Sequence, residues 1–121
     1  MEFKLIEDGE IEEVPSTKLC RMDAKGSGGA HHKYVVASRD LKKVFAGIEF
    51  QDGPIKENGV NGCQNEDLMM VIIDRLECFQ KGEFACDANH VTLAMCYETL
   101  KCMQARTQER TDRGVEGESK A

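Results

Sequence analysis

Hydrophobic and polar residues alternate in the first half of the chain, which is the pattern of half-buried β-strands. The alternation is clearest over residues 44–50, where Val44, Ala46, Ile48 and Phe50 fall on one side. Shorter runs of the same kind predict strands at residues 3–6, 11–14, 18–22 and 32–37. Asp8-Gly9 between the first two runs is a typical hairpin turn. The first half is therefore predicted to be a set of antiparallel strands.

The second half changes to helical periodicity. Asn65 is a candidate N-cap, and the apolar run 68–73 belongs to a helix that we expect to end near Gln80 or Lys81, before Gly82. A second helix is predicted from Asp87 or Ala88 to Gly114. Its apolar stripe at helical spacing consists of Leu93, Cys96, Tyr97, Leu100 and Met103.

These elements predict an α+β fold in which antiparallel strands precede two α-helices. The 121 residues suit a single domain, with a β-rich half at 1–62, a helical half at 63–113 and a polar tail at 114–121. The run 68–73 makes the first helix apolar on nearly every side, and such a helix must be covered on nearly every side. A chain of this size has little material for that, so an oligomer is expected.

Charge and composition exclude several classes of function. The net charge of −6 argues against binding long nucleic acid, which needs a basic surface. No stretch approaches the roughly 20 apolar residues that span a membrane, and the first residues do not resemble a secretion signal. The six cysteines form no Cys-x-x-Cys pair. Reduced, mostly buried cysteines in a cytosolic protein are the expectation.

Aromatic and amide side chains surround the turn between the two predicted helices. Phe79 and Phe84 bracket that turn, and Asn89 follows at the start of the second helix. Both rings suit packing where the helices meet, but either one could also stack on a nucleobase. Asn89 could cap the helix, or its amide could hydrogen-bond a base edge or a ribose. The residues by themselves leave these alternatives open.

Arginines gather at the far end of the second helix. Arg106, Arg110 and Arg113 follow one another at helical spacing, and Glu109 stands four residues before Arg113. Cations near a helix C-terminus complement the helix dipole, and Glu109 can pair with Arg113. The functional alternative is that these guanidinium groups bind phosphate oxygens.

Neither a nucleotide triphosphate loop nor a catalytic site is marked. The glycine-rich loop after Lys25 lacks the Gly-Lys-Ser/Thr ending of a P-loop, although it could close over a ligand with Lys25 reaching an anion. His31 and His32 are adjacent, so on a strand they point to opposite faces and cannot easily share a metal ion. No paired carboxylates or positioned nucleophile accompany them. A non-enzymatic protein without a cofactor is expected.

The chain resembles a family of phage proteins over most of its length. The segment from Asn65 to Gly117 is similar to the signal-sponge proteins of the first Thoeris anti-defence family, and more distantly to the smaller anti-CBASS sponges. The matching residues are Asn65-Glu66-Asp67-Leu68, Asp74-Arg75-Leu76, Phe79-Gln80-x-Gly82-x-Phe84-Ala85-Cys86, Asn89, Glu98, Arg106-Thr107, Arg110 and Arg113-Gly114-Val115-Glu116-Gly117, together with the loop and strand residues Gly28-Gly29-Ala30-His31-His32-Lys33-Tyr34.

This resemblance implies sequestration of glycocyclic ADP-ribose immune signals, without cleavage, in the cytoplasm of an infected bacterial host. Some such proteins also bind cyclic di- or trinucleotides, and the family forms dimers that assemble into hexamers. By motif position, Phe79 resembles the residue that stacks on adenine, Asn89 a polar contact, Arg106 a phosphate contact from a neighbouring subunit, and Lys25 a basic loop residue.

Arg110 and Phe84 complete the predicted ligand-binding set. Two other functions remain to be distinguished from the sponge. One is a structural or protein-interaction oligomer without a nucleotide ligand, and the other is a hydrolase of the same signals.

Overall fold

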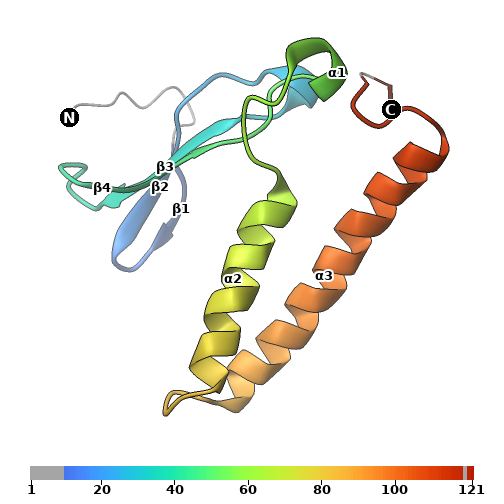
Figure 1. The fold of residues 1–121 in the computed structure, drawn as a ribbon. Helices are drawn as coiled ribbons and strands as arrows, with labels where there is room; N and C mark the ends of the chain where they lie inside the picture. Colours follow the sequence, from blue (N-terminus) through green and yellow to red (C-terminus); the bar gives the residue numbers. More distant parts are fainter. Residues whose placement is uncertain (1–9, 119) are drawn as a thin grey trace. The chain divides into compact units, whose positions relative to one another are not determined.

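The computed structural model describes residues 10–118 and 120–121, which form two compact units divided after Cys63 (Figure 1). The first unit is a sheet and the second is a pair of long helices. The predicted α+β class is confirmed, whereas the assembly of several chains stays a prediction. The predicted strand at 3–6 and the Asp8-Gly9 turn lie outside the described residues.

Four strands form one antiparallel sheet in the order β1-β2-β3-β4. Their bounds are Glu10–Val14, Thr17–Arg21, Lys33–Ser38 and Val44–Glu49. Each pairs with its neighbour in sequence, so the predicted strands at 11–14, 18–22, 32–37 and 44–50 are confirmed to within about one or two residues, the usual uncertainty of strand ends. The β1–β2 connection is tight, because Val14 lies opposite Thr17. A short 3₁₀ turn, η1 (Ser27–Gly29), lies in the loop between β2 and β3.

Small side chains fill the centre of the sheet. Cys20 in β2 and Ala37 in β3 are fully buried, and Val35 lies opposite Cys20 across the two strands. Tyr34 packs edge-on against Phe50, with ring centroids 5.7 Å apart. Such pairs add about 0.5–1.5 kcal/mol beyond the area that they bury.

The chain after β4 makes a compact loop that contains the short helix α1 (Ile55–Asn58) and returns to the sheet. Phe50 and Cys63 form an isolated parallel bridge where the loop closes. Gly62 is required there, because a Cβ atom at this position would lie 2.4 Å from the carbonyl carbon of Phe50. The Gln51 amide donates to the carbonyl oxygens of Gly53 and Gly59, so these two carbonyl groups of the loop are hydrogen-bonded.

Two helices make the second unit: α2 (Asn65–Gln80) and α3 (Asp87–Asp112), which pack side by side. The predicted N-cap at Asn65 is wrong by one residue, because Gln64 is the extended capping residue and Asn65 is already helical. The cause is Asp67, whose carboxylate accepts the backbone N–H of Gln64 at 2.8 Å and fixes the start there. Ile73 is the buried residue of α2.

Helix α3 ends at a glycine, as predicted. Gly114 has φ +74°, a conformation that costs a glycine little, and its N–H donates to the carbonyl of Thr111. The N–H of Val115 donates to the carbonyl of Arg110, which completes a Schellman motif. The chain thereby turns back at the end of α3. Among the described residues, no helix is long and apolar enough to cross a membrane.

Candidate functional site

The last turns of α2 present an aromatic ring together with a cation. Phe79 is the penultimate residue of the helix and keeps 37% of its surface exposed. The guanidinium carbon of Arg75 lies 5.0 Å from the centroid of this ring. Arg75 precedes Phe79 by four residues, the spacing at which side chains on a helix meet. Phe79 is therefore not a core residue, and one of its faces is in contact with a cation.

A side-chain clasp holds the turn between the helices. The Gln80 amide accepts the backbone N–H of Cys86 at 3.0 Å and donates to the Cys86 carbonyl at 3.1 Å. Phe84, inside this turn, is 70% exposed. The alternative that Phe84 packs where the helices meet is thus not what the structure shows. The turn has a fixed backbone and carries an exposed ring.

Asn89 lies in the first turn of α3 and is half-buried. The capping residue of α3 is Cys86, and no side chain there bonds the first backbone N–H groups. Within the described part of the chain, the Asn89 amide makes no hydrogen bond, so it does not cap the helix. Its donor and acceptor remain available to a group from outside the chain.

The face of α2 that carries Arg75 is uncovered within the helical unit. A shallow depression on it is lined by Met70, Val71, Asp74, Arg75, Cys78 and Phe79, all from α2. Exposed fractions of 56%, 64% and 45% at Met70, Val71 and Ile72 show how much apolar surface is left on this helix. Val91 and Met95 leave a second apolar strip on α3, at 55% and 66%. Contiguous patches of this kind usually mark binding surfaces.

Arginines at the far end of α3 differ sharply in their surroundings. Arg110 is only 7% exposed, and its guanidinium donates to the carbonyl oxygens of Val115, Glu118 and Lys120 and to the carboxylate of Glu116. These acceptors all come from the tail, which wraps around the guanidinium. The structure therefore engages Arg110 within its own chain, and its contact with a ligand stays a prediction.

Arg113 is also paired, whereas Arg106 is exposed. Arg113 forms an ion pair with Glu109 and donates to the carbonyl of Ala121 at 2.9 Å. The pairing of Glu109 with Arg113 is the one that the sequence predicts. The side chain of Arg106 has no ion pair or hydrogen bond with the residues that the structure describes. Of the three arginines, Arg106 is the one whose donors bond no described residue.

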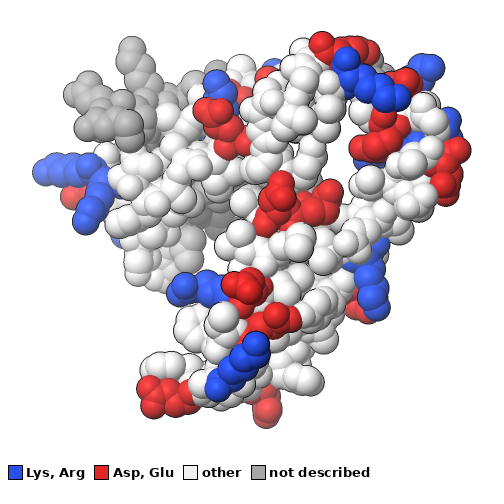
Figure 2. Space-filling view, viewed as in Figure 1, with Lys and Arg blue, Asp and Glu red and all other residues white. Residues whose placement is uncertain are grey.

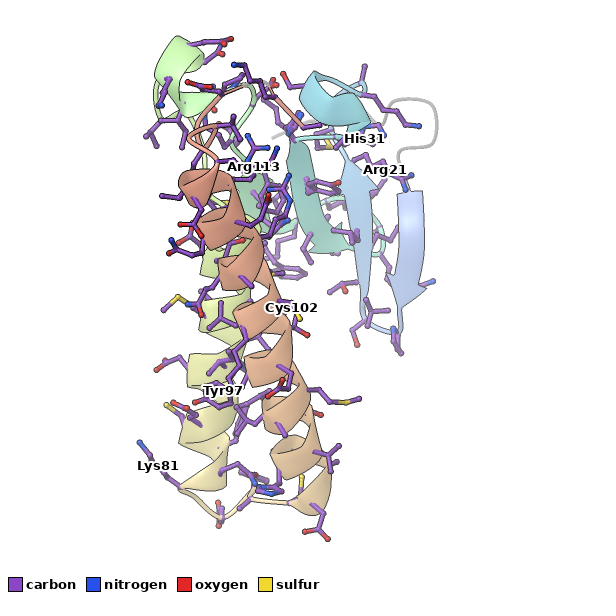
Figure 3. All side chains as sticks on the ribbon, turned by 90° about the vertical axis from the view of Figure 1, so that its right-hand side faces the viewer. Arg21, His31, Lys81, Tyr97, Cys102 and Arg113 are labelled. Carbon is purple, nitrogen blue, oxygen red and sulfur yellow. The ribbon has the colours of Figure 1, made fainter. Side chains whose placement is uncertain are left out.

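The candidate residues lie at opposite ends of the helical pair. Figure 3 shows Lys81, just after α2, at one end and Arg113 at the other, with Tyr97 and Cys102 between them. Asn89 and Arg106 are seventeen positions apart on the same helix, which corresponds to about 25 Å at 1.5 Å per residue. A ligand of mononucleotide size cannot touch both residues of one chain. The structure brings Phe79, Phe84 and Asn89 to one end and leaves Arg106 at the other.

Lys25 belongs to the first unit and is exposed in the loop before η1. Asp23 organises this loop, since its carboxylate accepts the backbone N–H groups of His32 at 3.0 Å and Lys33 at 3.1 Å. Partial burial raises the pKa of Asp23, but these two N–H donors and the nearby histidines outweigh it and hold the pKa below its usual value. The carboxylate stays ionised, and the loop has a defined shape.

The two histidines hold the same loop. The Nδ1 atom of His31 lies 2.6 Å from the Asp23 carbonyl oxygen, and the Nε2 atom of His32 lies 3.0 Å from that of Ser27. His32 also approaches the Asp52 carboxylate at 3.5 Å. Over the described residues, no group of three or more potential ligands is placed to hold a metal ion. Both histidines thus have structural contacts.

Arg75 and Gln80 belong to the motifs of the family resemblance, but the sequence predicts no role for either. The spacing of Arg75 and Phe79 was a usable signal, because residues four apart share a helix face. Nothing in the sequence marked Gln80 as a clasp, since its partner is the backbone of Cys86.

Figure 2 shows basic and acidic side chains interspersed over the visible face, without a large region of one sign.

No protein-family model matches the chain. The chain is similar to Thoeris anti-defense 1 of Bacillus phage SBSphiJ7, with 42% identity over 92 residues. The matched stretch covers 76% of this chain and 63% of that relative's length. Identity at this level over most of the chain shows common descent.

Proposed function

The chain belongs to the Thoeris anti-defence family, and from this premise we propose that it sequesters glycocyclic ADP-ribose without cleaving it. Removing this immune signal from solution would prevent it from reaching the effector of the bacterial Thoeris defence. The binding site that we propose is shared between two copies of the chain. Phe79 and Asn89 of one copy would meet Arg106 of the other.

The side chains at the two ends of the helical pair suit the two parts of such a ligand. The exposed ring of Phe79 can stack on adenine, a contact of about 1–3 kcal/mol. The unengaged amide of Asn89 can bond a base edge or a ribose hydroxyl. The guanidinium of Arg106 can donate two parallel bonds to phosphate oxygens. These groups bind charge and aromatic surface, and none of them is a strong acid or base for catalysis.

The separation of Asn89 and Arg106 is the observation that carries the proposal. About 25 Å of α3 lies between them, so one chain cannot offer both to a small ligand. The uncovered apolar face around Met70 and Val71 offers a surface on which a second chain can pack. An antiparallel pairing of two helical units would bring the turn end of one beside the arginine end of the other.

A sponge must bind its signal at low concentration, which calls for a dissociation constant near 1 nM, or about −12 kcal/mol. Stacking and charge-assisted hydrogen bonds supply part of this. A pocket already formed by assembly lowers the ordering cost of binding and encloses the ligand. The exposed loop that carries Lys25 has a defined shape, and we propose that Lys25 adds a further positive charge to the site.

Capture and release of the ligand tests sequestration. The protein is incubated with glycocyclic ADP-ribose, unbound ligand is removed by filtration, and the bound fraction is released by denaturation and identified by mass. Recovery of intact ligand in stoichiometric amount supports a sponge. A changed mass would indicate a hydrolase, and no retained ligand would contradict the proposal. Cyclic di- and trinucleotides, tested in the same way, show whether those signals are sequestered as well.

Mixing two variants tests the shared site. Phe79→Ala and Arg106→Ala should each lose the high-affinity binding, at about 1 nM, when they are produced separately. When both chains are co-expressed in equal amounts, a mixed dimer contains one site with both residues intact. About a quarter of all sites should then bind the ligand. Half of the dimers are mixed, and in each mixed dimer one of the two sites is intact while the other carries both substitutions. No recovery would place the site within one chain or assign it to other residues.

A structural or interaction oligomer without a nucleotide ligand is the second candidate. The exposed apolar strips on α2 and α3 favour it, since they require partners with or without a ligand. Thermal unfolding distinguishes the two, because a ligand that binds only the folded state raises Tm. A Tm that is unchanged by a panel of cyclic nucleotides would favour this candidate.

A further inference from the structure

Arg75 belongs to one of the motifs of the family resemblance, but the sequence by itself assigns it no role. Its guanidinium carbon lies 5.0 Å from the centre of the Phe79 ring, in the depression on the exposed face of α2. The Arg75 side chain makes no ion pair and no hydrogen bond with any described residue. Its N–H donors are thus free to bind an anion beside the ring that we assign to the base.

We propose that Arg75 contacts the pyrophosphate of the ligand while Phe79 stacks on its base. The inference rests on the proposed function and extends it, because it assigns a residue that recognises the charge of the ligand at the turn end. A ring has two faces. Arg75 lies over one face of Phe79, and we assign the other face to the base, so the two side chains together would match a nucleotide rather than a neutral nucleoside.

A purely structural role for Arg75 explains these observations less well than a ligand contact does. Helical pairs four residues apart stabilise a helix only slightly, and an exposed cation over a ring adds little more. A guanidinium held in this way keeps its donors at the edges of its plane, where the ring cannot use them. Asp74 lines the same depression but forms no ion pair with Arg75 within the described residues. The cation therefore lies beside the ring and is not neutralised by any described residue.

The test is the affinity for glycocyclic ADP-ribose, measured by calorimetry at low and at high ionic strength. Arg75→Ala should weaken binding by about 10- to 100-fold, the usual loss for a hydrogen bond to a charged group. Arg75→Lys should lose less, since it keeps the charge but not the planar fork. Lys101→Ala is the matched control, because it removes one exposed cation of α3 that is paired with Glu98. It should change the affinity less than about 2-fold.

The dependence on salt separates a phosphate contact from mere positioning of the ring. Affinity should fall more steeply with salt for the unaltered protein than for Arg75→Ala, because the variant lacks the charge that salt screens. An equal loss at both ionic strengths would show that Arg75 only holds Phe79 in place, and would overturn the inference. So would an unchanged affinity. No binding by the unaltered protein would overturn the proposed function, and this inference with it.

Discussion

The two ends of the helical pair differ in how their polar and aromatic groups are satisfied. At the turn end, Phe79 and Phe84 are exposed, and the amide of Asn89 has no hydrogen bond within the described residues. At the far end, Arg110 is buried, and four acceptors from the tail surround its guanidinium. Of the three arginines there, Arg106 is the one whose side chain bonds no described residue. One end is open to a partner, and the other is closed by its own chain.

This difference shows that residue type alone does not decide whether the donors of a cation are available to bind a ligand. Arg106 and Arg110 are four residues apart on one helix, and both suit phosphate binding by their chemistry. What separates them is the Schellman turn at Gly114, which returns the tail toward Arg110. The carbonyls of that tail occupy the donors that a phosphate would use.

The largest effect on the difference between the two ends is expected from removing the guanidinium that closes the far end. Arg110→Ala should lower the free energy of unfolding by about 2–3 kcal/mol, because several charge-assisted hydrogen bonds are lost at once. Thermal unfolding measures the loss. Hydrogen exchange should also show that the amides after Gly114 lose protection.

Arg106→Ala is the control for this experiment. Its side chain is exposed and bonds no described residue, so the stability should change by less than about 0.5 kcal/mol. Equal destabilisation by the two variants would mean that both arginines are structural. It would remove Arg106 from the proposed site.

The next largest effect is expected at the open end, in binding and not in folding. Phe79→Ala should weaken ligand binding by about 2 kcal/mol, or roughly 30-fold, through the loss of base stacking. The ring is partly exposed, so the unfolding transition should shift little. Calorimetric titration and thermal unfolding measure the two quantities on the same sample.

Phe79→Leu is the matched variant, because it keeps an apolar side chain but removes the aromatic face. Its affinity should fall nearly as far as that of Phe79→Ala. Retention of full affinity by the leucine variant would show that the ring acts by apolar packing, and stacking would be the wrong explanation.

A smaller effect is expected from the clasp that shapes the open end. Gln80→Ala removes two hydrogen bonds to the backbone of Cys86 and should cost about 1 kcal/mol of stability. Gln80→Glu still accepts the Cys86 N–H but turns a carboxylate oxygen, which cannot donate, toward the Cys86 carbonyl, so it should lose at least as much. Denaturant unfolding resolves the order. Equal stability of all three proteins would show that the clasp does not contribute.

The sequence predicted the elements well because strand alternation and helix periodicity are local. It also predicted the end of α3 at Gly114 and the pairing of Glu109 with Arg113, which depend on short spacings. The family resemblance drawn from motifs between residues 65 and 117 and from residues 28–34 is confirmed by the 42% identity to a phage Thoeris anti-defence protein.

What the sequence did not predict involves acceptors on the backbone. Arg110 bonds carbonyls five to ten residues downstream, and Gln80 bonds both backbone groups of Cys86. Every residue has a carbonyl, so no residue type marks such a partner. The helix start was misplaced for a related reason. Asp67 bonds the backbone of Gln64, and this moves the N-cap away from the better capping residue, Asn65.

The smallest effect sharpens the account of the closed end. Among the described acceptors of Arg110, Glu116 is the one that bonds through its side chain, with its carboxylate 3.1 Å from Nε and 42% of the side chain exposed. Glu116→Gln keeps an acceptor of nearly the same shape and removes only the charge. Because the Glu116 carboxylate is partly exposed and solvent screens its charge, the loss should be at most about 0.5 kcal/mol, and it should shrink further at high salt. Thermal unfolding at two ionic strengths checks this. If Glu116→Gln were as destabilising as Arg110→Ala, the ion pair would be what holds the tail; a small loss would show that the backbone carbonyls hold it.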